Sequence, residues 1–381
     1  MVTPTDSKTI DLLRLPCAVL VVFIHVFSSI GGGYVSYSES VYDFIRVLFS
    51  QGIARLAVPI FFLTSGFLFF QGFKQWDSKM FFAKIKKRFQ TLFIPYILWN
   101  LILVFYYALI FVAKGNTSGL IGLIDDNGWL LSFWNCSRNN IEPRINLLGW
   151  KMWDGAFPIN FPLWFIRDLM ILNLFAPLVY FVVKKMRIGG VVILFVLYVI
   201  DIWIPLEGLR AEGFFFYTIG AFLCVNSRGL TEPLRKIRHI ALLLSICTLP
   251  LCVFFYGSAW YWYVRRLFCT FGTVSAIWGM SVMVNRLGGK CCRFSPAFLS
   301  GASFFIFAAH MVGVKEIVCS LLNKVISLIP NSDSAVLDMT SILCYFSAPI
   351  LISSVIMVIY FVLQKKVPVI SSLLTGGRTR A

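Results

Sequence analysis

Residues 10–29 read IDLLRLPCAVLVVFIHVFSS, an apolar run that contains one arginine, Arg14, and one histidine, His25. About 20 consecutive apolar residues are enough for a helix to cross a bilayer. Arg14 and His25 are 11 positions apart, which is three helical turns plus about 20°, with a rise of roughly 16 Å. We therefore expect the two side chains on one face of a transmembrane helix, at different depths.

Similar apolar runs recur along the whole chain. Of its 381 residues, 59% are hydrophobic and 13% are charged, whereas a soluble domain usually has about 25% charged residues. This composition excludes an ordinary soluble enzyme and predicts an all-α polytopic membrane helix bundle, a single integral membrane domain over 1–381. Runs bounded by Gly, Pro or charge predict about ten spans, at 11–30, 44–71, 91–113, 161–183, 188–204, 213–226, 239–257, 261–284, 295–323 and 338–363.

The positive charge of the chain indicates how it is oriented. The net charge is +17, and 21 of the 34 Lys and Arg fall in one alternate set of connections, 6 in the other and 7 within spans. Positive connections remain cytoplasmic, so we expect both termini to be cytoplasmic in a multi-pass protein of the cell inner membrane. Because topology accounts for the charge, we expect membrane lipid rather than nucleic acid as its partner. The long connection at 114–160 is then external, and its Trp residues suit either the membrane interface or contact with a sugar.

Ionisable residues inside the predicted spans are the candidates for function. Such a residue costs at least about 2.5 to 3.5 kcal/mol in the hydrocarbon core, so it usually faces protein, water or a ligand. Histidine is suited to moving a proton at neutral pH, and two of the three histidines, His25 and His310, lie at membrane depth. Arg55 and the doublet Arg265 and Arg266 could line an internal anion site. Arg167 and Asp168 could contact a substrate or neutralise each other, and no third ligand with convincing spacing suggests a metal site.

A basic cluster opens the third predicted span. It contains Lys84, Lys86, Lys87 and Arg88, and such clusters commonly hold topology or contact anionic lipid. Beside a cavity with Arg14 at its mouth, the cluster would also attract a polyanionic cofactor. A nucleotide-pantetheine thioester fits this geometry, with its phosphates at the basic entrance and its arm extended toward His25.

Four ordered segments resemble the acyltransferase-3 family of multispan membrane O-acyltransferases: IDLLRLPCAVLVVFIH at 10–25, RLAVPIFFLTSGFLF at 55–69, PLWFIRDLMIL at 162–172 and SFFIFAAHM at 303–311. The resemblance covers the whole chain. It implies transfer of an acyl group, in most members acetyl, from acyl-CoA to a hydroxyl of a cell-envelope glycan or lipid-linked sugar. Members commonly have two arginines three residues apart at the start of the third span, where this chain has Arg88 and then Thr91.

The resemblance also assigns expected roles. His25 would be the general base or an acyl relay, with His310 in a lesser catalytic role. The acetyl-CoA donor would be held by Arg14, Arg88, Lys84 and Lys87. Apart from the resemblance, we expect substrate contacts from Arg55, Trp164, Arg167 and Asp168, which lie in or beside the predicted spans.

Two other classes of protein remain open from the sequence. A transporter or flippase of an anionic lipid-linked saccharide could use the same arginines and histidines as a conduction path and proton-coupled gate, although no internal repeat of the kind common in transporters is evident. A non-catalytic scaffold explains poorly why cations should line up within hydrocarbon.

Overall fold

The computed structural model describes residues 3–32, 36–38, 40–116, 118–119, 129–136, 144–145, 149, 151–152, 157–204, 206–227, 229–287, 295–330 and 334–378. Most of these residues are helical, which confirms the all-α class. The first half of the chain forms α1 (Pro4–Val26), α2 (Val41–Arg46), η1 (Val47–Gly52), η2 (Ile53–Leu56), α3 (Ala57–Phe69), α4 (Ser78–Arg88), η3 (Phe89–Phe93), α5 (Ile94–Ala113), α7 (Trp129–Asn135), η4 (Phe161–Leu163), α8 (Trp164–Leu174), α9 (Ala176–Phe181) and η5 (Val182–Met186). The second half forms α10 (Arg187–Val199), α11 (Ala211–Val225), α12 (Thr231–Phe254), α13 (Trp260–Leu287), α14 (Pro296–Ala309), α15 (Val314–Ile326), α16 (Ser334–Lys366) and α17 (Pro368–Leu374).

The predicted external connection is described only in part. Two-residue strands β1 (Arg144–Ile145) and β2 (Lys151–Met152) pair antiparallel, with Arg144 opposite Met152. Helix α7 also belongs to this segment. The prediction that the Trp residues of 114–160 suit the membrane interface or contact with a sugar falls largely outside the described residues.

Local sequence signals fix where several helices begin. The Thr3 hydroxyl accepts from the backbone N–H of Asp6 at 3.1 Å, and the Asp6 carboxylate accepts from the Thr3 backbone at 3.2 Å, a capping box that starts α1. Asp77 caps α4, and Ser295 caps α14 directly before Pro296. These caps satisfy backbone N–H groups that a helix start leaves without partners.

The chain is a multi-pass membrane protein. Six helical stretches are long and apolar enough to cross a membrane, and the bent pair α14–α15 makes a seventh, in the part of the chain that the structure describes. Large apolar side chains face outward along these helices; Leu243 and Ile246 of α12 are each 61% exposed. Such a surface would be unstable in water. The other three predicted spans correspond to short or interrupted helices at α8–α9, α10 and α11, so the count of ten stays a prediction.

The ninth predicted span is broken rather than continuous. Helix α14 ends at Ala309, the chain turns, and α15 leaves at an angle of 71°. Gly313 has φ +77°, a backbone conformation that side chains with a Cβ rarely adopt. The break places His310 at the end of α14, in the interior of the bundle.

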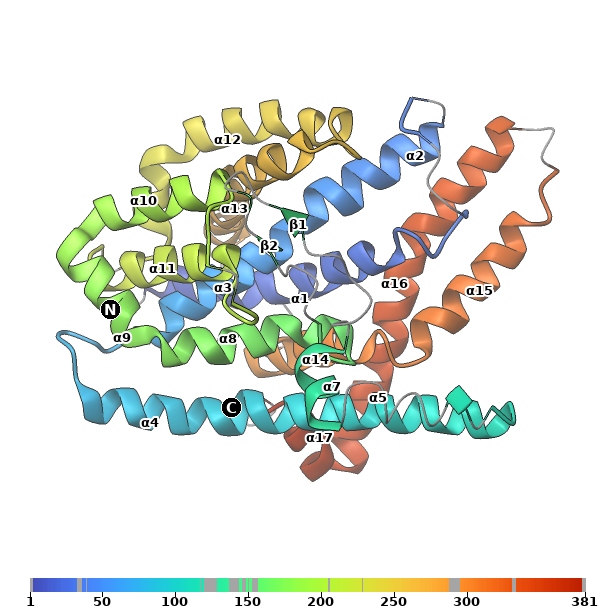
Figure 1. Ribbon diagram of the computed structural model, residues 1–381, viewed down its shortest axis with the longest axis horizontal. Coiled ribbons are helices and arrows are strands. Elements are labelled where there is room, and N and C mark those ends of the chain that lie inside the picture. The colour runs from blue at the N-terminus through green and yellow to red at the C-terminus, as the bar shows by residue number, and fades with distance from the viewer. Residues whose placement is uncertain are drawn as a thin grey trace.

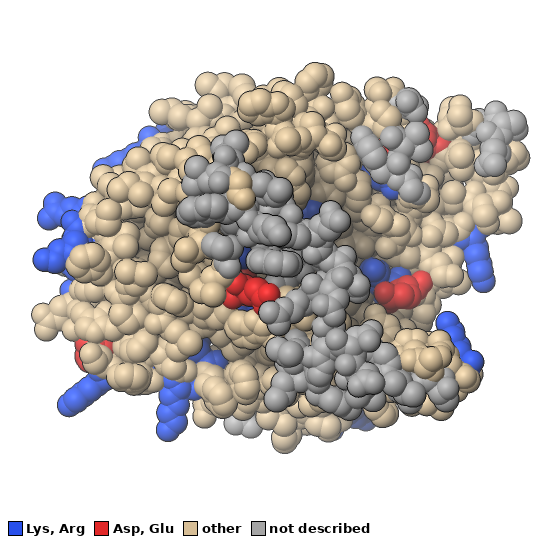
Figure 2. Space-filling view, viewed as in Figure 1, with Lys and Arg blue, Asp and Glu red and all other residues tan. Residues whose placement is uncertain are grey.

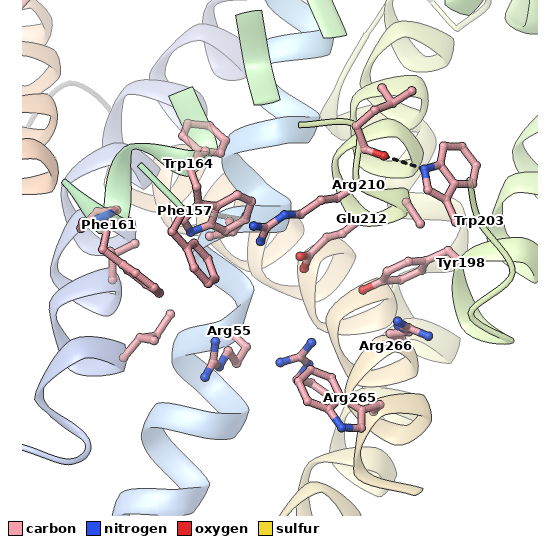
Figure 3. A pocket seen from close by; sticks show the side chains of 18 of the residues that line it. Arg55, Phe157, Phe161, Trp164, Tyr198, Trp203, Arg210, Glu212, Arg265 and Arg266 are labelled. Carbon is pink, nitrogen blue, oxygen red and sulfur yellow. Dashed lines mark hydrogen bonds between the residues drawn. The ribbon is translucent and has the colours of Figure 1, made fainter. Parts of the chain in front are cut away.

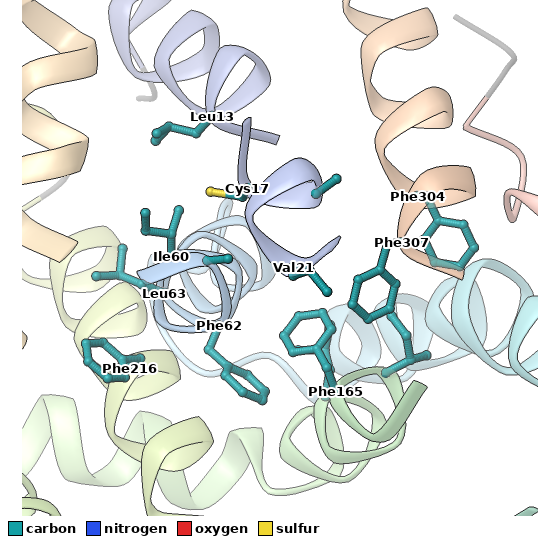
Figure 4. Packing of buried hydrophobic residues seen from close by; sticks show 14 of the residues in the cluster. Leu13, Cys17, Val21, Ile60, Phe62, Leu63, Phe165, Phe216, Phe304 and Phe307 are labelled. Atoms are coloured by element: carbon teal, nitrogen blue, oxygen red, sulfur yellow. The ribbon is translucent and has the colours of Figure 1, made fainter. Parts of the chain in front are cut away.

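Helix α1 lies in the middle of the bundle, against α3, α13, α14 and α16 (Figure 1). Figure 4 shows its inner face, where Leu13, Cys17 and Val21 approach Ile60 and Leu63 of α3. Arg14 and His25, at different positions along α1, consequently lie in different surroundings. Most Lys and Arg visible in Figure 2 gather along its left edge, near the amino terminus. The sidedness of the termini stays a prediction.

Helices α3 and α11 are in especially close contact. A Cβ on Gly66 would lie 2.1 Å from the carbonyl oxygen of Tyr217, and one on Gly220 would lie 1.9 Å from that of Leu63. Only glycine permits this approach, as in other small-residue helix contacts in membranes. Ser65, beside Gly66, instead lines a cavity.

Candidate active site

A cavity of about 240 Å³, the histidine cavity, contains His25 in its wall. Helices α1, α3, α8, α10, α11, α13 and α14 all contribute to it. Figure 3 shows aromatic rings and arginines directed into the space between these helices. The polar and aromatic lining residues that matter here are His25, Arg55, Phe157, Phe161, Trp164, Tyr198, Trp203, Arg210, Glu212, Trp262, Arg265 and Arg266.

His25 lines this cavity, and His310 lies behind it, against the His25 ring. Their ring centroids are 5.0 Å apart, and Phe161 is edge-on to His25 at 5.3 Å. His310 is fully buried, and its Nδ1 lies 3.1 Å from the carbonyl oxygen of Ile306. A carbonyl can only accept, so Nδ1 bears the proton and Nε2 has a free lone pair. Nε2 has no hydrogen-bond partner among the described residues.

Arginines from η2 and α13 line the histidine cavity. Arg55 donates to Oε1 of Gln51 at 2.5 and 3.1 Å. Arg266 pairs with Asp201 at 2.5 Å. The Arg265 guanidinium lies 4.4 Å from the ring of Trp262, and Glu212 lines the same space. The lining thus combines positive charge with flat aromatic faces.

A second region, the arginine cavity, is formed by two hollows of about 130 and 270 Å³ that share Arg14, Arg88 and Arg378. Lys84 and Lys87 line the larger hollow. The structure therefore places all four predicted donor-binding residues around one cavity, although they come from α1 and α4. The sequence analysis did not select Arg378 as a candidate.

Three rings, the phenylalanine layer, separate the two cavities. Phe165 and Phe307 line both cavities, and Phe61 lines the arginine cavity. The three rings are in mutual contact, with centroids 5.7, 6.4 and 5.8 Å apart; Figure 4 shows Phe165 and Phe307 beside each other. Arg14 and His25 do not share one continuous wall as the sequence suggested, because this layer closes the space between them.

Arg167 and Asp168 form a buried ion pair at 2.8 Å. Arg167 also donates to the carbonyl of Trp134 at 2.5 Å, and Arg210 approaches Asp168 at 3.4 Å. Neither member of the pair is in the lining of the histidine cavity, whereas Trp164 and Arg55 are. The network ties α8 to α7 and to the start of α11.

Arg210 and Glu212 line the histidine cavity, and the sequence analysis did not select them. The Arg210 guanidinium lies 4.0 Å from the ring of Trp164 and 5.0 Å from that of Phe157. Arg210 directly precedes α11, and Glu212 lies in its first turn. Both are outside the predicted span 213–226, so neither was recognised as a charge inside the membrane. Within the described ranges, no group of three or more His, Cys, Asp or Glu is placed to hold a metal ion.

Comparison with known proteins identifies the family of the chain. The family model described as an acyltransferase domain matches residues 7–358, so the chain belongs to the acyltransferase-3 family and is a membrane acyltransferase. The chain is also 24% identical over 393 residues to the succinoglycan biosynthesis protein ExoH of Rhizobium meliloti (strain 1021), covering 98% of this chain and 93% of that protein. No solved structure matches the chain.

Proposed function

We propose that the protein transfers an acyl group, acetyl in the first instance, from acyl-CoA to a hydroxyl of a cell-envelope glycan or lipid-linked sugar in the inner membrane. The observation that carries the proposal is the pairing of an arginine-lined cavity with a histidine-containing cavity across the phenylalanine layer. The first suits a phosphorylated donor, since guanidinium groups bind phosphate in two-point hydrogen bonds. The second suits a hydroxyl acceptor and its deprotonation.

The acceptor assignment follows from the lining of the histidine cavity. Aromatic faces such as Trp164 and Trp262 offer flat apolar surfaces beside polar tips, which fits a sugar ring. Arg55, Arg210 and Arg265 favour an acceptor that also bears negative charge. A polysaccharide precursor meets both conditions, and the name of the rhizobial relative points to the same class of substrate.

The chemistry requires one base at the acceptor hydroxyl. In the proposed path the rings of the phenylalanine layer move apart to admit the thioester arm of the donor. His25 then removes the hydroxyl proton, the oxygen attacks the thioester carbonyl, and the C–S bond breaks as the C–O bond forms. The proton on His25 then passes to the released thiolate of coenzyme A. The buried Nε2 of His310 lies on the neighbouring ring and can accept a hydrogen bond from the acceptor hydroxyl or from His25. An acyl-histidine intermediate on His25 uses the same groups.

The test is acyl transfer by the purified full-length protein in liposomes, with radiolabelled acetyl-CoA and isolated envelope glycan. We expect label in the glycan with the wild type, and a loss of at least about 100-fold with His25→Ala, in the range for removal of a general base. The matched control is His239→Ala, because His239 is an exposed histidine outside both cavities.

Saccharide transport separates the proposal from the flippase alternative. Movement of a lipid-linked saccharide across the liposome membrane without any labelled product would overturn the acyltransferase assignment for this substrate. Full activity in the His25→Ala protein would leave transfer standing and remove the proposed chemistry.

A further inference from the structure

The chain segment after α17 folds back against the start of the third membrane helix. The indole N–H of Trp99 donates to the carbonyl of Leu374 at 3.0 Å. Gly376 has φ +63°, and a Cβ there would lie 2.3 Å from the carbonyl oxygen of Thr91. This contact between two backbones fixes the tail beside η3. Figure 1 shows α17 next to α5.

The fold-back directs Arg378 into the arginine cavity. Its Nη1 donates to the carbonyl of Thr91 at 3.1 Å and to that of Thr375 at 2.5 Å. Its guanidinium carbon lies 4.1 Å from the centre of the Phe304 ring. The side chain is therefore oriented by the tail, η3 and α14, and it lines both hollows together with Arg14 and Arg88.

Positive charge in this cavity exceeds the negative charge that neutralises it. Arg14 pairs with Asp11 at 2.9 Å, whereas neither Arg88 nor Arg378 has a carboxylate within ion-pair distance among the residues described. Burial and the charges of Arg14 and Arg88 lower the pKa of Arg378. Three guanidiniums around one space repel each other, and a multivalent anion placed among them relieves that repulsion.

We infer that Arg378 binds a phosphate group of the acyl-CoA donor, so that the carboxyl-terminal tail completes the donor site; this inference rests on the proposed function. The carbonyl of Thr91 accepts a hydrogen bond from Arg378, and Thr91 follows Arg88 by three residues, about one helical turn. The guanidinium groups of Arg378 and Arg88 therefore reach the cavity from neighbouring positions along this helix. The rigid fork of arginine suits phosphate oxygens better than a lysine would. A lipid headgroup offers the same phosphate chemistry, and the experiment separates the two sources.

The test measures coenzyme A binding by the full-length protein in phosphatidylcholine nanodiscs. Loss of a charge-assisted hydrogen bond predicts that Arg378→Ala weakens binding about tenfold. Adding Thr91→Arg to that variant should restore most of the affinity, because it returns a guanidinium to the same place. Lys366→Ala removes an exposed cation near the same end of the chain and should have no effect. Pantetheine, which lacks the phosphates, should not distinguish the variants.

Arg378→Gln keeps donors for the two carbonyls and covers the case in which the alanine variant does not fold. Equal coenzyme A affinity in wild type and Arg378→Gln, with acyl transfer intact, overturns the inference and leaves the proposed function standing. A difference that appears only when phosphatidylglycerol is added assigns Arg378 to a lipid headgroup and also overturns it. A wild-type protein that transfers no acyl group and binds no coenzyme A overturns both.

Discussion

The rings of His25 and His310 lie 5.0 Å apart, although the two residues belong to helices separated by most of the chain. His25 borders the histidine cavity, and His310 is held behind it by the carbonyl of Ile306. The two imidazoles therefore differ in access. The half-buried ring of His25, which lines the cavity, can meet a substrate there, whereas the fully buried ring of His310 can only assist.

This difference predicts unequal effects of substitution at the buried histidine. His310→Phe keeps an aromatic ring in place but removes the Nε2 lone pair and the Nδ1 contact to Ile306. We expect kcat to fall about tenfold, less than for His25→Ala, because a proton acceptor is lost beside the base. The KM for acyl-CoA should stay within about twofold. Steady-state kinetics in liposomes measure both values, and a change confined to KM would contradict the assisting role.

The Arg14–Asp11 pair predicts opposite effects of two neighbouring changes. Arg14→Ala should raise the KM for acyl-CoA about tenfold, since a phosphate contact is lost. Asp11→Asn should lower it several-fold, because it removes the carboxylate that competes for Arg14 at 2.9 Å. Lys8→Ala, an exposed position on the same helix, is the control. If Arg14→Ala and Asp11→Asn change the KM for acyl-CoA in the same direction, Arg14 does not hold the donor.

The phenylalanine layer predicts a separation of binding from turnover. Phe307→Trp adds bulk where the thioester arm must pass, so kcat should fall about tenfold while coenzyme A affinity is unchanged. Phe307→Ala should increase hydrolysis of the donor without acceptor, because water gains access to the thioester. Melting temperatures of both variants check the fold. Unchanged turnover in the tryptophan variant would place the acyl path elsewhere.

The contact between α3 and α11 predicts a stability effect away from both cavities. Gly66→Ala places a methyl group 2.1 Å from the carbonyl oxygen of Tyr217 and forces the helices apart. Overpacking of this kind costs roughly 1 to 3 kcal/mol, which a thermal melt in detergent would detect. Gly279→Ala is the matched control, since nothing lies within 4 Å of a Cβ there. Equal melting temperatures for the two variants would contradict the close contact.

The Arg167–Asp168 pair predicts loss of stability rather than of substrate affinity. Asp168→Asn leaves Arg167 buried without its carboxylate, a change that costs about 3 to 5 kcal/mol. The control is Glu232→Gln, which breaks an exposed pair with Arg235 and should cost about 0 to 1 kcal/mol. A raised KM for the acceptor in a fully stable Asp168→Asn protein would instead support the substrate contact that the sequence allowed.

The sequence predicted those features that depend on local pattern. Apolar runs located the helices, and the cluster at Lys84, Lys87 and Arg88 predicted where a basic cavity would form, because its members lie within two turns of one helix. The shared face of Arg14 and His25 followed from helical spacing alone. Spacing along one helix, however, does not show which side chains of other helices pack between Arg14 and His25.

Features that depend on tertiary contacts could not be predicted in the same way. The phenylalanine layer combines rings from three helices, and Arg378 reaches the arginine cavity only because Gly376 lets the tail touch η3. The break after His310 had a local signal in Gly313, but an isolated glycine in an apolar run is also compatible with a continuous helix.

The closed layer of Phe61, Phe165 and Phe307 has a consequence for the cell that houses the enzyme. A continuous water-filled path through the protein would let ions leak across the membrane and would dissipate ion gradients. Phe61, Phe165 and Phe307 are in mutual contact between the arginine cavity and the histidine cavity. In the proposed reaction, this contact would keep water and ions from passing between the two cavities while an acyl group is transferred.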